Sequence, residues 1–376
     1  MPQSPATPES MLRPEVLGFE AYHAGLSIEA IQEKYGLAQV VKLASNENPL
    51  GASPLVQEVL KRRADSVFRY PRSRNPGLVR AIAERMGAAE ERIVVGNGSD
   101  ELIDLLIRVR ANPGRDNILA FDPCFSMYQL QARLCGVEFR QVPLNSDFSF
   151  PWADFLARVD ERTAIAFVTT PDNPTGYAPP VEELETLARA LPETCLLVVD
   201  EAYMDFAEPQ ERYSLAPRAH QFPNLVILRT FSKMYGLAGL RLGFGLMPEW
   251  LADYVWRVRM PFSVNLMAEE AGKAALADEV FFAETRRVTL NGRDFLVREL
   301  GRLGCETAPT QANFLLVKAP EASGFTGRRL FEALLPKGVI IRPLDNYGLP
   351  AHVRVSVGAP HENARFIEAL AEVLDA

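Results

Sequence analysis

The sequence predicts an α/β protein with a mostly parallel central sheet flanked by helices and a smaller C-terminal α/β domain. Two observations predict this fold. Short, uniformly apolar runs recur from about Arg92 to Leu246, and amphipathic stretches with apolar residues three and four apart separate several of them. Strands that are apolar along their whole length are typical of a parallel sheet covered on both faces. After Leu246 the spacing of apolar residues changes to that of long helices.

Each element of this fold is predicted by a short run bounded by turn residues. The strands of the large domain are RIVVGN, NILAFD, VEFRQVPL, AIAFVTT, CLLVVDE, NLVILRTF and LRLGFGL, with helices such as SDELIDLLIRVR and VEELETLARAL between them. The tail is ANFLLVKA, GRRLFEALLPKG, VIIRPL, HVRVSVG and ENARFIEALAEVL, a strand-helix-strand-strand-helix pattern. We therefore expect an N-terminal arm over residues 1–45, a large domain over 46–255 and a small domain over 256–376.

Composition excludes several classes of function. The 376 residues include 40 basic and 48 acidic side chains, and an acidic chain without a dense basic run is a poor ligand for nucleic acid or anionic membranes. The four cysteines and four histidines are dispersed, which argues against disulfides and a metal site. The start resembles no signal peptide, and no apolar run is long enough to span a membrane. We expect a soluble, cytoplasmic protein.

Polar residues follow the predicted strands at the edge where a parallel sheet binds its ligands. The first strand is followed by Gly98, Ser99 and Asp100 at the start of a helix, where free backbone N–H groups can bind a phosphate. A plain strand-to-helix turn explains the same residues about as well. A nicotinamide dinucleotide site is the other alternative, but Glu101 stands where its fingerprint needs the third glycine.

Asp200 and Lys233 are the most informative of these residues. Asp200 ends the apolar run CLLVVD, and a carboxylate there is costly unless a cation meets it, although it could also cap the next segment. Lys233 lies in TFSKMYGLAGLRLGF, where apolar surroundings would lower its pKa and make the amine nucleophilic. The alternative for Lys233 is an exposed loop lysine.

Taken together, these groups predict a pyridoxal phosphate site. Lys233 would hold the cofactor aldehyde as a Schiff base, and Asp200 would keep the pyridine nitrogen protonated so that the ring accepts electrons. Tyr203 and Asn173 would bind the phenolic oxygen, and Phe125 would cover one ring face. The phosphate would lie among the remaining candidates, which are Gly98, Ser99, Asp100, Ser232 and Arg241.

The motifs PDNPTG, VVDEAYMDF and TFSKMYGLAGLRLGF resemble those of the fold-type I, pyridoxal-phosphate-dependent aminotransferases of classes I and II. More narrowly, the chain resembles the histidinol-phosphate aminotransferase family of histidine biosynthesis. The stretches VKLASNENPLG, RYP, GNGSDELI and VRVSVGAPHENARFIEAL support this resemblance, which runs from about Tyr22 to the C-terminus.

The resemblance implies a homodimer with shared active sites and a reaction between L-histidinol phosphate and 2-oxoglutarate. It implies that Tyr70 reaches the cofactor phosphate of the neighbouring subunit. It also implies that Arg354 binds the α-carboxylate of glutamate and, in the other half-reaction, the phosphate of histidinol phosphate. Arg342, Tyr22 and Asn48 would complete the substrate site.

Three other activities fit parts of the pattern. An aromatic amino-acid aminotransferase or a threonine-phosphate decarboxylase would use the same site with another substrate. A nicotinamide-dependent dehydrogenase would use the same kind of sheet, against the missing third glycine. A regulator that senses the cofactor would need a DNA-reading domain, for which the short N-terminal arm has no room.

Overall fold

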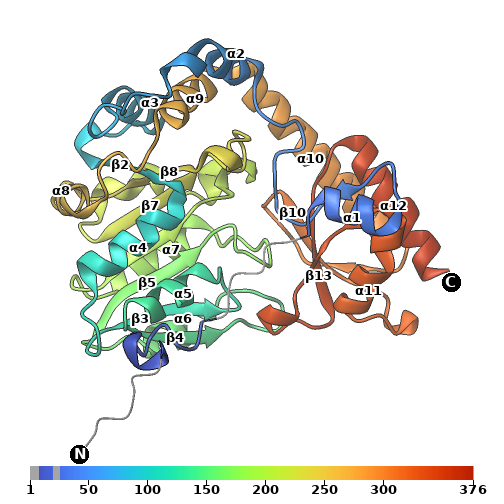
Figure 1. Ribbon diagram of the computed structural model, residues 1–376. Coiled ribbons are helices and arrows are strands. Elements are labelled where there is room, and N and C mark those ends of the chain that lie inside the picture. The colour runs from blue at the N-terminus through green and yellow to red at the C-terminus, as the bar shows by residue number, and fades with distance from the viewer. Residues whose placement is uncertain (1–7, 20–25, 376) are drawn as a thin grey trace, which may run out of the picture.

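In the computed structural model, which describes residues 8–19 and 26–375, the chain forms two lobes (Figure 1). The larger lobe surrounds a seven-stranded sheet of order β2-β8-β7-β6-β5-β3-β4, and all seven predicted strands are in it. Its strands are β2 Ile93–Asn97, β3 Asn117–Asp122, β4 Glu138–Pro143, β5 Thr163–Thr169, β6 Leu196–Asp200, β7 Leu225–Thr230 and β8 Leu242–Leu246. Neighbours from β7 to β4 are parallel, whereas β8 runs antiparallel to both β2 and β7.

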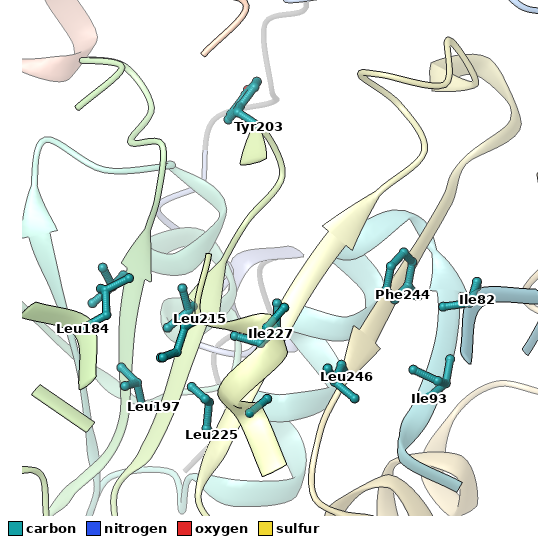
Figure 2. Close-up of a cluster of buried hydrophobic side chains, with 14 of the residues drawn as sticks. Ile82, Ile93, Leu184, Leu197, Tyr203, Leu215, Leu225, Ile227, Phe244 and Leu246 are labelled. Atoms are coloured by element: carbon teal, nitrogen blue, oxygen red, sulfur yellow. The ribbon is translucent and has the colours of Figure 1, made fainter. Parts of the chain in front are cut away.

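Alternate residues of these strands enter two separate apolar cores because successive side chains point to opposite faces of a sheet. Val199 and Ile227 face one core, which α2, α3, α7 and α9 cover, and Val198 and Val226 face the other, which α4, α5 and α8 cover. The bounds of these helices are α2 Pro54–Arg63, α3 Pro76–Met86, α4 Gly98–Arg110, α5 Met127–Leu134, α7 Val181–Ala190, α8 Glu249–Val258 and α9 Leu266–Ala277. A short helix, α6 Trp152–Ala157, precedes β5. Figure 2 shows the first core, with Tyr203 beyond the end of its strand.

The smaller lobe contains the predicted tail. Its four-stranded sheet has the order β12-β13-β10-β9, and the long helix α10 joins it to the larger lobe (Figure 1). Its elements are α10 Glu279–Arg302, β9 Glu306–Thr307, β10 Phe314–Lys318, α11 Gly327–Leu334, β11 Val339–Ile340, β12 Arg342–Pro343, β13 His352–Ser356 and α12 Pro360–Leu374. Leu296, Leu315 and Phe366 are fully buried in its core.

Part of the predicted N-terminal arm packs against the smaller lobe. The strand β1, Val41–Lys42, pairs in parallel with β11, and the helix α1, Ile28–Tyr35, places Ile31 against Leu335 and Ile340. Ser27 caps α1 by accepting a hydrogen bond from the Ala30 backbone N–H. After β1 the chain passes to the larger lobe through residues 44–48, which therefore lie between the lobes.

The described part of the chain has no helix that is both long and apolar enough to cross a membrane. Within the same residues, no three His, Cys, Asp or Glu side chains form a group that could hold a metal ion.

Candidate active site

The turn between β2 and α4 forms a narrow cradle against the residue before β8. Gly98 starts α4 with a φ of +75°, and its N–H donates to the Arg241 carbonyl at 3.0 Å. The Arg241 guanidinium donates back across the turn to Asp100 at 3.1 Å. The left-handed φ of Gly98 favours glycine at this position, and a Cβ there would lie 2.5 Å from Arg241 Nη2 and displace the guanidinium. The cradle presents the free N–H groups of a helix start beside a guanidinium, which is an anion-binding arrangement.

Lys233 follows β7 and reaches the segment that joins the two lobes. Its Nζ donates to the Ser45 carbonyl at 3.2 Å and lies 5.7 Å from the centre of the Tyr203 ring. Burial, with the nearby Arg354 guanidinium, lowers the pKa of Lys233 to about 8. No carboxylate forms an ion pair with this amine among the described residues. A substantial fraction of the amine is therefore neutral near physiological pH.

Asp200 ends β6, the strand beside β7, and is buried. Its Oδ2 accepts the Tyr128 hydroxyl at 2.9 Å, and its Oδ1 accepts the Ala202 backbone N–H at 3.1 Å. Burial raises the pKa of Asp200 to about 6, although both hydrogen bonds oppose this effect. Within the described ranges no cation pairs with Asp200. This buried carboxylate is thus poised to meet a positive group from outside the chain.

Arg354 comes from the smaller lobe and reaches the site from the opposite side. Its Nη1 donates to Asn173 Oδ1 at 2.5 Å and its Nη2 to the Ala44 carbonyl at 3.0 Å. Its Nε is buried without a hydrogen-bond partner in the described part of the chain. Arg342 stands directly opposite Arg354 in the pairing of β12 with β13. Two guanidiniums therefore belong to one end of the smaller sheet.

The other site residues predicted from the sequence differ in exposure and in their contacts. Ser232 and Asn173 are buried, whereas Phe125 is half-buried, and its ring lies edge-on to the Tyr128 ring at a centroid distance of 5.7 Å. Asn48 uses its amide to donate to the Met234 carbonyl at 2.7 Å, next to Lys233 in the chain. Tyr70 is 82% exposed and stacks on Phe262. Tyr22 lies outside the described residues.

Two residues of this site were not predicted as site residues from the sequence. Tyr128 looks like a core residue because it sits at helical spacing among apolar side chains, yet its hydroxyl bonds Asp200 and Thr169. Asn46 is buried and donates through Nδ2 to the Tyr203 hydroxyl oxygen at 3.1 Å. The stretch SNENP, noted only as a shared motif, was the signal for Asn46.

The residues present fit pyridoxal phosphate. The cofactor carries an aldehyde, a basic ring nitrogen, a phenolic oxygen and a phosphate. The site offers each of them a complementary group, namely a partly buried amine, a buried carboxylate, a phenol and an anion-binding helix start. The cradle is also shaped by a second close approach, because a Cβ on Gly243 would lie 2.4 Å from the Ser99 backbone nitrogen.

Comparisons with known proteins give the same assignment. The family described as aminotransferase class I and II matches residues 38–371. Histidinol-phosphate aminotransferase from Nitratidesulfovibrio vulgaris strain Hildenborough is 61% identical over 363 residues, covering 96% of each chain. The crystal structure of histidinol-phosphate aminotransferase from Sinorhizobium meliloti in complex with pyridoxal-5'-phosphate superposes with a TM-score of 0.87 at 27% identity, covering 97% of this chain and 98% of that one.

The chain is also similar in fold to an enzyme with another activity. L-threonine-O-3-phosphate decarboxylase from Porphyromonas gingivalis superposes with a TM-score of 0.77 at 24% identity, covering 90% of this chain and 100% of that one. This likeness concerns the fold alone. The fold is therefore shared between transaminases and a decarboxylase.

Proposed function

The chain belongs to the aminotransferase class I and II family, and from this premise we propose that it transfers the amino group of L-histidinol phosphate to 2-oxoglutarate. The products are imidazole acetol phosphate and L-glutamate, and the reaction is reversible. One observation carries the proposal. A partly buried amine and a buried carboxylate, Lys233 and Asp200, follow neighbouring strands, and neither has an ion-pair partner in the described part of the chain.

When bound, pyridoxal phosphate supplies an aldehyde that exchanges amines and a ring that accepts electrons from the substrate α-carbon. Lys233 Nζ would take the proton from that carbon as a general base and, within the same half-reaction, give it as a general acid to the cofactor carbon that carried the aldehyde. Its lowered pKa, to about 8, suits both tasks. Asp200 holds a proton at the ring nitrogen, and Tyr203 donates to the phenolic oxygen.

The phosphate and the substrate are held by separate cations. Ser99, Ser232 and Arg241 bind the cofactor phosphate together with the start of α4. Arg354 binds the carboxylate of glutamate or the phosphate of histidinol phosphate, since a planar guanidinium accepts either anion through two parallel hydrogen bonds. Arg342, Tyr22 and Asn48 are proposed to assist with the substrate.

We also propose that the active protein is a homodimer in which Tyr70 completes the cofactor-phosphate site of the other subunit. Phe68 and Tyr70 are 74% and 82% exposed, and the ring of Tyr70 stacks on Phe262 at 4.8 Å. Exposed aromatic groups of this kind are typical of an interface. We place the enzyme in the cytoplasm, because its unpaired cysteines are typical of a reducing compartment.

The test compares three amine substrates with the purified, cofactor-loaded protein. Histidinol phosphate should be consumed with 2-oxoglutarate as acceptor at a kcat/KM at least about tenfold above that for phenylalanine. Threonine phosphate should release no carbon dioxide. A preference for phenylalanine, or release of carbon dioxide, would assign the site to one of the two related activities instead. Lys233→Ala should lower turnover by at least about a hundredfold in the same assay.

A further inference from the structure

The segment that joins the lobes makes several contacts with the active site. The Ala44 carbonyl accepts from Arg354 and the Ser45 carbonyl accepts from Lys233, as described above. The next residue, Asn46, is only 1% exposed and has a φ of +54°. This left-handed conformation is unfavourable for most residues other than glycine, asparagine and aspartate. Asn46 tolerates this conformation, so the fold holds a buried amide directly beside a predicted catalytic tyrosine.

The hydrogen bonds around Asn46 fix which of its side-chain atoms faces that tyrosine. Ser356 Oγ accepts the Asn46 backbone N–H at 2.8 Å, so its own hydrogen is free to donate to Asn46 Oδ1, also at 2.8 Å. With Oδ1 occupied in this way, Nδ2 faces Tyr203 and donates to its oxygen at 3.1 Å. Asn313 Nδ2 holds the Asn46 carbonyl at 3.1 Å. The chain of donors thus runs in one direction, from the backbone to Tyr203.

This direction decides where the Tyr203 hydrogen points. A hydroxyl that accepts from Asn46 cannot also donate to it, and Asn46 is its hydrogen-bond partner within the described residues. Burial raises the pKa of Tyr203, although Arg354 and Asn46 oppose this, so the hydroxyl keeps its hydrogen at neutral pH. The other charged groups near it are Asp200, Asp100 and the Lys233 amine.

We propose that Asn46 is a positioning residue that turns the Tyr203 hydroxyl hydrogen toward the phenolic oxygen of the cofactor. The inference rests on the proposed cofactor but concerns a residue outside the predicted site. Its consequence is measurable without turnover. A hydrogen bond donated to that oxygen stabilises its negative charge, and so it lowers the pH at which the visible band of the lysine-bound cofactor titrates.

Asn46→Asp is the most direct test because it keeps the shape and tolerates the positive φ but removes the N–H donor. The new oxygen accepts the Tyr203 hydrogen and withdraws it from the cofactor. Absorbance titration of the cofactor-loaded protein should show the pKa of the visible band raised by about one pH unit, the size of one charge-assisted hydrogen bond. Tyr203→Phe should raise it by a similar amount.

The double variant Asn46→Asp with Tyr203→Phe separates this route from a direct effect of the added charge. If Asn46 acts through Tyr203, the double variant titrates like Tyr203→Phe alone. If Asn46→Asp raises the pKa by the same amount with and without Tyr203, the inference is overturned. Ser356→Ala tests the same inference independently, because it frees the Asn46 amide to turn its oxygen toward Tyr203. This variant should also raise the pKa of the visible band, by less than Asn46→Asp does.

Thermal melts of the apoproteins show whether each variant is folded. An unmoved pKa in folded Asn46→Asp and in Ser356→Ala overturns the inference and leaves the proposed function intact. A wild-type protein that gives no visible band with pyridoxal phosphate overturns the proposed function, and the inference falls with it.

Discussion

Lys233 shows how a single side chain acquires reactivity from its surroundings. An ordinary lysine is charged at neutral pH, but burial and the neighbouring Arg354 disfavour the charged form here. The amine hydrogen-bonds to a carbonyl rather than to a carboxylate, so little restores its affinity for the proton. The residue therefore combines two requirements for catalysis, a neutral nitrogen and a position between the two lobes.

The rate at which the apoprotein takes up pyridoxal phosphate should rise with pH through about 8 and then level off, because the neutral amine is the reacting form. The growth of visible absorbance after rapid mixing measures this rate. A rate that keeps rising toward pH 10.5, the ordinary pKa of lysine, would contradict the assigned environment.

The lowered pKa of Lys233 also determines how the stability of the apoprotein depends on pH. The unfolded chain binds the Lys233 proton more tightly, so this group adds stability to the apoprotein as pH rises from about 8 to 10.5.

Arg354 is proposed to bind both substrates, and its replacement should affect both equally. Arg354→Lys keeps the charge but loses the planar pair of donors, so KM should rise by about tenfold or more for glutamate and for histidinol phosphate. Arg365→Lys on the exposed face of α12 is the matched control and should change neither value. Steady-state kinetics in the two directions measure both constants. A rise for only one substrate would mean that the two anions bind at different places.

At the scale of elements, the site depends on the alignment of neighbouring strand ends. Glu201, which follows Asp200, is fully buried and accepts from both Nε and Nη2 of Arg229 on β7. Arg229 also donates to Asp205 at 2.8 Å. This ion pair joins the end of β6 to the end of β7, where Arg229 lies four residues before Lys233. It thereby sets the spacing between the carboxylate and the amine of the site.

Glu201→Gln should destabilise the protein by about 3 kcal/mol, the lower end of the range for breaking a buried ion pair, because Asp205 remains as the one carboxylate partner of Arg229 that is described above. Arg287→Met is the control. It removes an exposed pair with Glu284 on α10 and should cost at most about 1 kcal/mol. Urea unfolding of the apoproteins measures both values. Equal effects of the two substitutions would show that the buried pair contributes nothing special.

The sequence predicted those elements whose patterns are local. Asp200 and Lys233 were found because each follows a continuous apolar run, and such runs identified all seven strands. The antiparallel direction of β8 was not predictable, since a buried strand has the same composition in either direction. The packing of α1 and β1 on the smaller lobe depends on contacts such as Ile31 with Leu335, far apart in the chain. The role of Asn46 depends on its φ and on Ser356, which no local pattern shows.

At the scale of the whole molecule, the two lobes form one site, with Arg354 on one side and Lys233 on the other. The segment from Ala44 to Asn46 contacts residues of both lobes. The exposed aromatic groups around Phe68 and Tyr70 lie on the surface of the larger lobe. We therefore expect that a second copy covers these groups.

Phe68→Glu should convert the protein from a dimer to a monomer, because a buried unpaired charge at an interface is strongly unfavourable. The affinity for pyridoxal phosphate should fall at the same time, since Tyr70 of the other subunit is then lost. Phe68→Leu is the matched control and should remain dimeric. Light scattering during gel filtration gives the mass. A monomeric wild-type protein with full cofactor affinity would contradict the shared site.

The most direct test of the whole account is a spectral titration of the cofactor-loaded protein with histidinol phosphate and no acceptor. The account predicts that the visible band disappears, that absorbance at shorter wavelength replaces it, and that 2-oxoglutarate restores the original spectrum. Lys233→Ala should show neither conversion nor recovery at a comparable rate. A wild-type spectrum that histidinol phosphate leaves unchanged, while the protein remains folded and loaded, would contradict the account.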